Sequence, residues 1–265
     1  LYASALSAGV TPATVINDAP VVLDNIAAAE TWRPENDSGK FYGPTRLREA
    51  LAFSRNLVSI RVLQRVGIGP FIRYVEQLGF NTEGMQANLT LALGTHAFTP
   101  LELASGYAIL ANGGFKVEPW LIARIENAQG DIVYAADPLV ACPECIASDG
   151  GDSEEVRMEE ILGTAVPEVR AAERVMDPRV AYIVSSFLRD AIQRGTGRRA
   201  KVLERADIGG KTGTTNGPRD AWFSGFNRDL ITTAWVGFDD YSPLGRREFG
   251  GTAALPIWID YMREA

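Results

Sequence analysis

The sequence predicts an α+β domain in which an antiparallel sheet of about five strands is covered by helices. Three observations predict this class. The first half of the chain carries apolar residues mainly at helical spacing, strand-like runs follow, and the last part of the chain contains three short strand-like segments separated by turns. Because helices stand before and after the strands, we expect them to pack on the sheet.

The bulk properties suit one large domain. The chain has 265 residues, 46% hydrophobic and 22% charged, with no internal repeat and no clear domain boundary, so we expect residues 1–265 to form a single unit. A net charge of −7 disfavours a general nucleic-acid role. No run approaches the roughly 18 to 20 apolar residues of a membrane span, and the first residues lack the basic flank of a signal peptide. Any anchor or export signal is expected outside this sequence.

The first predicted helices meet at a short polar junction. Residues 44–53 form an amphipathic pattern with Leu47 and Leu51, and a second pattern runs over residues 57–66. Ser54, Arg55 and Asn56 fall between the two, where their side chains can project into a cleft.

Two later helices have clear boundary signals. Thr99-Pro100-Leu101-Glu102 has the capping-box pattern, and Asn112-Gly113-Gly114 ends that helix. Asp177-Pro178 opens the next helix, whose apolar face continues at helical spacing until Gly195. That face is long enough to require a large packing partner, and we expect it to lie on the sheet.

Strands are expected between and after these helices. Residues 115–125 and 130–134 flank a turn at 127–130, and residues 207–214, 221–226 and 231–238 have the pattern of an antiparallel meander. Residues 144–174 are rich in Asp and Glu with few aromatic residues, so we expect a mobile acidic insertion there.

The two cysteines form Cys142-Pro143-Glu144-Cys145. This spacing fits a redox pair, half of a zinc site or a local disulfide. A zinc site needs two more ligands, and His96 is the only histidine. We favour a structural clip of the loop, and we expect neither a metal nor a cofactor.

The most informative segment is Gly209-Gly210-Lys211-Thr212-Gly213-Thr214. It is not a phosphate loop, because Arg205 stands where such a loop needs its first glycine and no helix follows. At the edge of a sheet, Gly213 would let another backbone approach, and the lysine and hydroxyls would suit an extended peptide with a terminal carboxylate. Alone, the motif also fits a plain turn at a strand end.

Ser54-Arg55-Asn56 and Lys211-Thr212-Gly213 together are typical of β-lactamases and penicillin-binding proteins. The chain resembles the transpeptidase domain of class A, bifunctional penicillin-binding proteins over nearly its whole length. The resemblance extends to Thr99-Pro100 and to five further segments, namely Thr11–Pro20, Trp32–Asn36, Leu91–Gly94, Ala111–Gly114 and Asp220–Gly225.

The resemblance implies a fold of the penicillin-binding protein and serine β-lactamase type and a serine acyl-enzyme mechanism. The family's Ser-x-x-Lys motif does not occur in these 265 residues, and the resemblance places it a few residues before Leu1, so the domain is expected to be incomplete at its N-terminus. By carry-over, Ser54 would pass a proton to the leaving nitrogen, Asn56 would orient the substrate amide, and Lys211 would supply positive potential.

The same carry-over assigns the substrate carboxylate to Thr212 and Thr214, beside Gly213, and half of an oxyanion hole to the backbone N–H of Thr214. Each residue has a plainer interpretation: Ser54 as a helix cap, Asn56 as a loop-backbone partner, Lys211 as a solvated charge. A serine-histidine triad through His96 is disfavoured because no Gly-x-Ser-x-Gly elbow occurs. Trp222, next to the Lys-Thr-Gly strand, could support the cleft.

The implied activity is D,D-transpeptidation of peptidoglycan stem peptides that end in D-Ala-D-Ala, with inhibition by β-lactams. The resemblance also implies a membrane anchor and a glycosyltransferase domain in the full-length protein, at the periplasmic face of the bacterial inner membrane. Two alternatives stay open: a serine β-lactamase, which would hydrolyse its acyl-enzyme within seconds, and a non-catalytic peptidoglycan-binding module.

Overall fold

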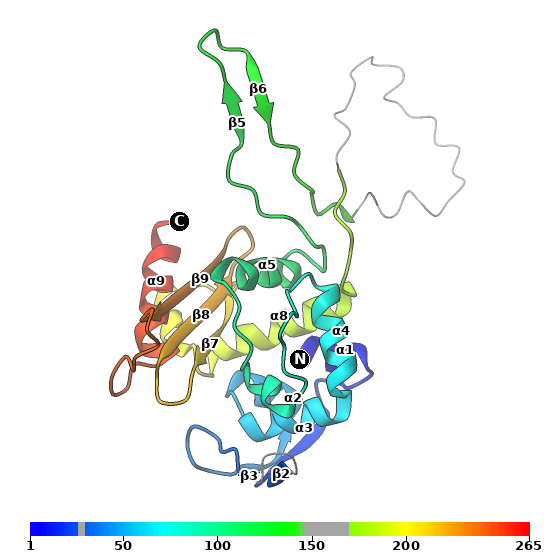
Figure 1. Ribbon diagram of the computed structural model, residues 1–265, viewed down its shortest axis with the longest axis vertical. Coiled ribbons are helices and arrows are strands. Elements are labelled where there is room, and N and C mark those ends of the chain that lie inside the picture. Colours follow the sequence, from blue (N-terminus) through cyan, green and yellow to red (C-terminus); the bar gives the residue numbers. More distant parts are fainter. Residues whose placement is uncertain (26–29, 144, 146–169) are drawn as a thin grey trace, which may run out of the picture.

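The computed structural model describes residues 1–25, 30–143, 145 and 170–265, and its ribbon is shown in Figure 1. The α+β class is confirmed: helices surround antiparallel strands. The helical elements are α1 Tyr2–Ser7, α2 Leu47–Ala52, α3 Asn56–Val66, α4 Ile68–Gln77, η1 Leu89–Leu93, α5 Pro100–Ala111, α8 Pro178–Gln193, η3 Arg198–Leu203, η4 Gly250–Ala254 and α9 Leu255–Glu264. The strands are β1 Val15–Asp18, β2 Leu23–Asn25, β3 Glu30–Trp32, β4 Gly43–Arg46, β5 Arg124–Glu126, β6 Ile132–Ala135, β7 Gly209–Thr214, β8 Asp220–Phe226 and β9 Ile231–Gly237.

The largest sheet described is the antiparallel meander β7-β8-β9, with β7 at its edge. The meander expected over residues 207–238 is confirmed, but within the described residues the sheet has three strands rather than about five. The other strands form separate pairs, β1 with β4, β2 with β3 and β5 with β6. The strand count was wrong because a sequence pattern identifies strands without showing which of them share one ladder.

Helices pack against both faces of this sheet. Phe223 and Phe226 are three positions apart in β8 and therefore point to opposite faces. Phe223 lies 5.0 Å, centroid to centroid, from the buried ring of Trp258 in α9, and Phe226 lies 6.4 Å from the ring of Tyr107 in α5. The sheet is thus held between the last helix and α5.

Helix α8 joins the sheet to the helical half of the molecule and runs through its middle in Figure 1. Leu188 lies against Gly209 of β7 and in the cluster that contains Phe226, while Phe187 is fully buried among residues of α1, α2 and α3. The expectation that this helix packs on the sheet is confirmed. Its two faces explain the long apolar pattern from Val180 to Ile192.

Several boundaries differ from the sequence-based expectation. Residues 44–46 belong to strand β4 and not to a helix, because Thr45 pairs with Ile16 of β1 and the helix starts only at Leu47. Residues 115–125 are not one strand: Phe115 forms an isolated bridge to Arg174, and regular pairing begins at Arg124. Pro119 lies between them and has no N–H to offer a ladder.

The β5–β6 hairpin projects from the body, as Figure 1 shows. Beyond it, Cys142 and Cys145 form a disulfide, in agreement with the favoured interpretation as a loop clip. The acidic insertion expected at 144–174 lies outside the described residues except for 145 and 170–174. Within the parts of the chain that are described, no helix combines the length and apolarity needed to cross a bilayer.

Candidate active site

Ser54 occupies the turn that separates α2 from α3. Its N–H donates to the carbonyl of Leu51, and the N–H of Arg55 donates to the carbonyl of Ala50, which together form a Schellman-type end of α2. The residue that follows the C-cap in this motif is usually glycine, because its φ is positive. Ser54 has φ of 54°, so a residue with a side chain has been placed in the left-handed region.

The Ser54 hydroxyl meets the ammonium of Lys211 on the edge strand β7. Lys211 Nζ donates to Ser54 Oγ at 2.5 Å and to the carbonyl of Thr212 at 2.8 Å, across a separation of 157 residues from the serine. Burial of the ammonium lowers the pKa of Lys211 to about 8. The structure therefore brings together the two segments that the sequence predicts to converge.

Charged side chains in α8 and at its C-cap connect α8 to α2, the helix that precedes Ser54. Arg194 donates to both carboxylate oxygens of Glu49, at 2.7 and 2.8 Å, and to Asp190 at 2.8 Å. Asp190 also accepts from Arg48 at 3.1 Å. Each exposed pair contributes little alone, but the four groups form one network between α2 and α8.

The turn after α8 connects the end of α2 to strand β7. The N–H of Thr196 donates to the carbonyl of Ala52 at 3.2 Å, and the Thr196 hydroxyl accepts from the Thr212 hydroxyl at 2.8 Å. Thr196 is thus a site residue that the sequence analysis missed. No local motif marks it, because its importance comes only from contacts with residues distant in the chain.

Thr214 ends strand β7 and is exposed. Its hydroxyl oxygen accepts from the N–H of Gly250 at 2.9 Å, which leaves its hydrogen as a donor. A Cβ on Gly250 would lie 2.4 Å from the carbonyl oxygen of Gly213, so only glycine allows η4 to approach the strand this closely. Gly213 itself lies against the Cβ of Trp222, its partner in β8, which agrees with a supporting position for that tryptophan.

Asn56 begins α3, and its amide donates to the carbonyl of Glu35 at 2.9 Å. The segment that carries Glu35 is fixed by Asn36, which donates at 2.9 Å to both carboxylate oxygens of the fully buried Asp18. Asn56 therefore hydrogen-bonds loop backbone, as its plainer interpretation expects. It also lies two residues after Ser54, at the start of the next helix. Asp18 was also missed as a supporting residue, although it lies inside the Thr11–Pro20 segment.

His96 lies away from this contact. Its ring packs edge-on against Phe98 at 4.9 Å between centroids, in the loop before α5. The structure records no hydrogen bond of its ring to a serine among the described residues. This placement gives no support for a serine-histidine triad.

Comparison with known proteins places the chain in a family. Residues 1–229 match the family described as the penicillin binding protein transpeptidase domain. The chain belongs to this family. The expected class of protein is thereby confirmed.

Relatives within this penicillin-binding protein family match along the whole chain. Penicillin-binding protein 1A of Pseudomonas aeruginosa is 48% identical over 99% of this chain and 34% of its own length, and penicillin-binding protein 1A of Neisseria cinerea is 40% identical over 100% of this chain and 30% of its own length. The chain thus spans about a third of the length of these relatives.

Solved structures show the same fold. The crystal structure of penicillin-binding protein 1A from Haemophilus influenzae has a TM-score of 0.88 at 37% identity, over 99% of this chain and 40% of that one. PonA1 from Mycobacterium tuberculosis in complex with penicillin V has a TM-score of 0.73 at 21% identity, over 99% of this chain and 65% of that one, which is a likeness of fold.

Proposed function

We propose that this chain forms the substrate groove of a D,D-transpeptidase that cross-links peptidoglycan stem peptides through a serine acyl-enzyme and is inhibited by β-lactams. The observation that carries the proposal is the 2.5 Å contact between Lys211 Nζ and Ser54 Oγ at the open edge of the sheet. The relatives at 40 to 48% identity are named penicillin-binding proteins, which supports the same ligand class.

The groove suits a peptide with a carboxylate at its end. Among the described residues no strand pairs with the outer edge of β7, so an extended peptide can add there. Lys211 and the hydroxyl of Thr214 can bind its terminal carboxylate, and Thr212 can join them when its hydroxyl turns away from Thr196. A penicillin offers a carboxylate beside a strained amide, so it can occupy the same groups. The backbone N–H of Thr214 would serve as one oxyanion donor.

Ser54 is assigned the transfer of a proton to the leaving nitrogen, and Lys211 the positive potential beside it. A serine nucleophile, expected in the Ser-x-x-Lys segment before Leu1, gives its proton to the lysine of that segment and attacks the penultimate D-alanine carbonyl. The C–N bond to the terminal D-alanine breaks after that nitrogen gains a proton, so the terminal D-alanine leaves as a free amine. Ser54 is suited to deliver this proton, because its hydroxyl can donate to the leaving nitrogen while its oxygen accepts from Lys211. An amine from a second stem peptide then attacks the acyl-enzyme carbonyl, the ester C–O bond breaks, and the proton that the amine loses returns to the serine oxygen. Asn56 would orient the substrate amide.

Fluorescent penicillin tests the proposal. The chain is produced with the preceding Ser-x-x-Lys segment of its own protein, and we expect covalent labelling that falls roughly a hundredfold in rate in the Ser54→Ala and Lys211→Ala variants. Lys201→Ala, which removes an exposed lysine of η3, is the matched control and should label normally. The 265-residue chain alone should stay unlabelled.

Three results would contradict parts of this proposal. Labelling of the 265-residue chain would move the nucleophile to a residue inside it. Normal labelling of the Lys211→Ala variant would show that Lys211 does not take part in the reaction with penicillin. Release of the label within seconds would indicate a β-lactamase in place of a transpeptidase.

The membrane anchor, the glycosyltransferase domain and the periplasmic location implied by the resemblance remain proposals about the longer protein. The chain matches 34% of the length of its Pseudomonas aeruginosa relative, so that relative is long enough to contain further domains.

A further inference from the structure

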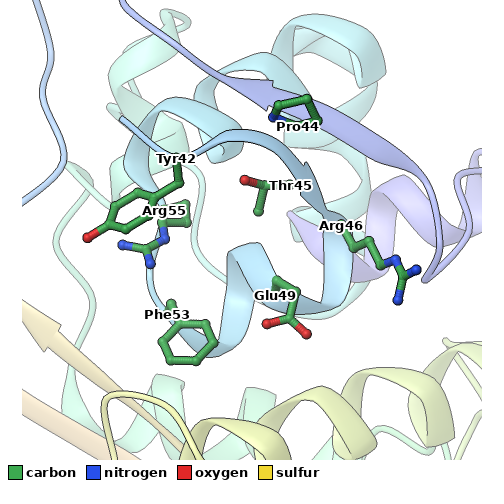
Figure 2. Close-up of a pocket in the computed structure, with 7 residues that line it drawn as sticks. All are labelled: Tyr42, Pro44, Thr45, Arg46, Glu49, Phe53 and Arg55. Carbon is green, nitrogen blue, oxygen red and sulfur yellow. The ribbon is translucent and has the colours of Figure 1, made fainter. Parts of the chain in front are cut away.

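An open pocket of about 400 Å³ lies next to the turn that carries Ser54. Its lining comes from the residue before β4, from β4, from α2 and from the turn after α2. Figure 2 shows these residues, which are Tyr42, Pro44, Thr45, Arg46, Glu49, Phe53 and Arg55. Phe53 and Arg55 are the residues on either side of Ser54. The pocket and the Ser54–Lys211 contact therefore share one turn of the backbone as a common wall.

Arg55 is held in the pocket by aromatic rings. Its guanidinium carbon lies 3.3 Å from the centroid of the Tyr42 ring and 5.4 Å from that of Phe53. In Figure 2 the guanidinium lies between these two side chains. Hydrogen bonds with Ser38 and with the Arg55 guanidinium lower the pKa of the Tyr42 hydroxyl. Stacking covers the flat faces of the guanidinium and fixes the group before any ligand arrives, and its other in-plane N–H donors stay available to a ligand.

The charges of the pocket leave Arg55 without a carboxylate. Among the ion pairs of the described residues, Glu49 is engaged by Arg194, and neither Arg55 nor Arg46 has an acidic partner. A half-buried guanidinium that is preorganised and lacks an anion is suited to bind a carboxylate through two parallel hydrogen bonds. A purely structural role would be satisfied by the stacking alone and would give no preference between charged and neutral ligands.

The position of the pocket relates it to the substrate groove. A peptide whose terminal carboxylate lies on Lys211 extends about 3.3 Å per residue, so its next few residues can reach past the Ser54 turn. We propose that the pocket is an anion subsite, in which Arg55 binds a carboxylate that the donor peptide carries upstream of its D-Ala-D-Ala end. This inference rests on the proposed function and adds a specificity-determining residue to it.

Binding to the 265-residue chain tests the inference without requiring catalysis. Two synthetic peptides ending in Lys-D-Ala-D-Ala carry one glutamate before the lysine, with its carboxyl either free or amidated, and their affinities are measured by isothermal titration calorimetry. We expect the free acid to bind roughly tenfold to a hundredfold tighter, the range for hydrogen bonds to a charged group. Arg55→Gln should remove this ratio and leave the affinity for the amidated peptide unchanged.

Two further variants complete the design. Arg55→Lys retains the charge without the planar fork and should keep only part of the ratio. Arg65→Gln removes an exposed arginine of α3 with the same change in net charge, and its ratio should equal that of the unmodified chain.

The outcomes separate this inference from the proposed function. If both peptides bind equally to the unmodified chain and Lys211→Ala weakens both, the anion subsite is wrong and the groove stands. An equal loss for both peptides in Arg55→Gln also overturns the subsite, because the residue then acts only on the fold. If neither peptide binds, the proposed function and the inference fail together.

Discussion

Ser54 shows how the site places a hydroxyl in an unfavourable backbone conformation. The Schellman-type end of α2 needs a positive φ after the C-cap, where glycine is preferred and a side chain costs roughly 1 to 2 kcal/mol. Glycine would have no hydroxyl for Lys211. The local strain is thus retained at a residue whose side chain makes the longest-range contact of the candidate site.

This strain can be measured with two variants that both lack the hydroxyl. We expect Ser54→Gly to be more stable to urea than Ser54→Ala by about 1 kcal/mol, because only alanine retains the penalty of a Cβ at positive φ. Both variants lose the Lys211 hydrogen bond, so the difference isolates the backbone. Equal stability of the two variants would mean that the turn relaxes to a negative φ.

The lowered pKa of Lys211 predicts a pH dependence in an accessible range. Binding of a D-Ala-D-Ala peptide needs the ammonium, so affinity should fall about tenfold per pH unit above about 8, and an ordinary lysine would retain it to about 10.5. Stability should change in the opposite sense: between these values the unfolded chain binds the proton more tightly, so the free energy of unfolding rises with pH.

Calorimetric titrations of the peptide from pH 7 to 10 check this prediction. In Lys211→Arg the charge persists, so its affinity should stay flat over the same range. A wild-type affinity that is constant to pH 10 would show that the ammonium stays hydrated and that its pKa is not lowered.

At the residue scale, the sequence predicted only those site residues that belong to short recognisable motifs. Ser54 and Lys211 belong to recognisable patterns, and the structure places them in contact. Thr196 and Asp18 could not be found in this way, because their partners, Thr212 and Asn36, lie 16 and 18 residues away and no spacing rule relates them. The catalytic roles of the motif residues stay predictions.

At the scale of elements, helices with chemical boundary signals were predicted well. The capping box at Thr99 and Glu102 and the Asp177 cap are present at the expected residues. Residues 44–46 were misread because Pro44 suits the start of a helix as well as a strand, and pairing with β1 decided between them. Tertiary hydrogen bonds of this kind are not encoded in local composition.

The contact between α2 and the turn after α8 predicts a strong effect of a small change. A Cβ on Gly195 would lie 2.0 Å from the carbonyl oxygen of Ala52, which is backbone and cannot rotate away. We expect Gly195→Ala to lower the free energy of unfolding by about 1 to 3 kcal/mol and to weaken peptide binding, because the end of α2 that carries Ser54 must move.

Urea unfolding and calorimetry measure both effects. Gly69→Ala in α4 is the control, since its Cβ would meet only the flexible end of Arg73 at 3.5 Å. That variant should be neutral or more stable by roughly 0.5 to 1 kcal/mol, as for an ordinary helical glycine. If Gly195→Ala behaves like the control, the packing of α2 on this turn is looser than the geometry indicates.

At the scale of the whole molecule, α8 unites a helical half and a sheet half into one body with the site at their junction. Phe187 is buried with α1 to α3, and Leu188 lies against β7, so neighbouring residues of one helix belong to different clusters. Ser54 comes from the helical half and Lys211 from the sheet. Their contact therefore depends on the packing of α8 more than on any local element.

The β5–β6 hairpin stands apart from this body (Figure 1), and its removal should have little effect on stability. All residues from 124 to 135 are exposed, and the N–H of Ala136 donates to the carbonyl of Ala123 at 2.9 Å, so the two ends of the hairpin already lie side by side. Replacing residues 124–135 by Asn-Gly closes the connection with a two-residue turn. We expect the free energy of unfolding to change by less than about 1 kcal/mol, because no buried side chain is lost.

A contrasting variant marks where the body begins. Phe115 is fully buried and stacks with Arg174, so Phe115→Ala should cost about 3 to 5 kcal/mol in the same urea titration. Peptide affinity should be unchanged by removing the hairpin, since the Ser54–Lys211 groove is built from other elements. A loss of stability in the shortened chain as large as that of Phe115→Ala would show that the hairpin packs on the body in solution. In that case residues 124–135 would be part of the packed body, although they are exposed in this structure.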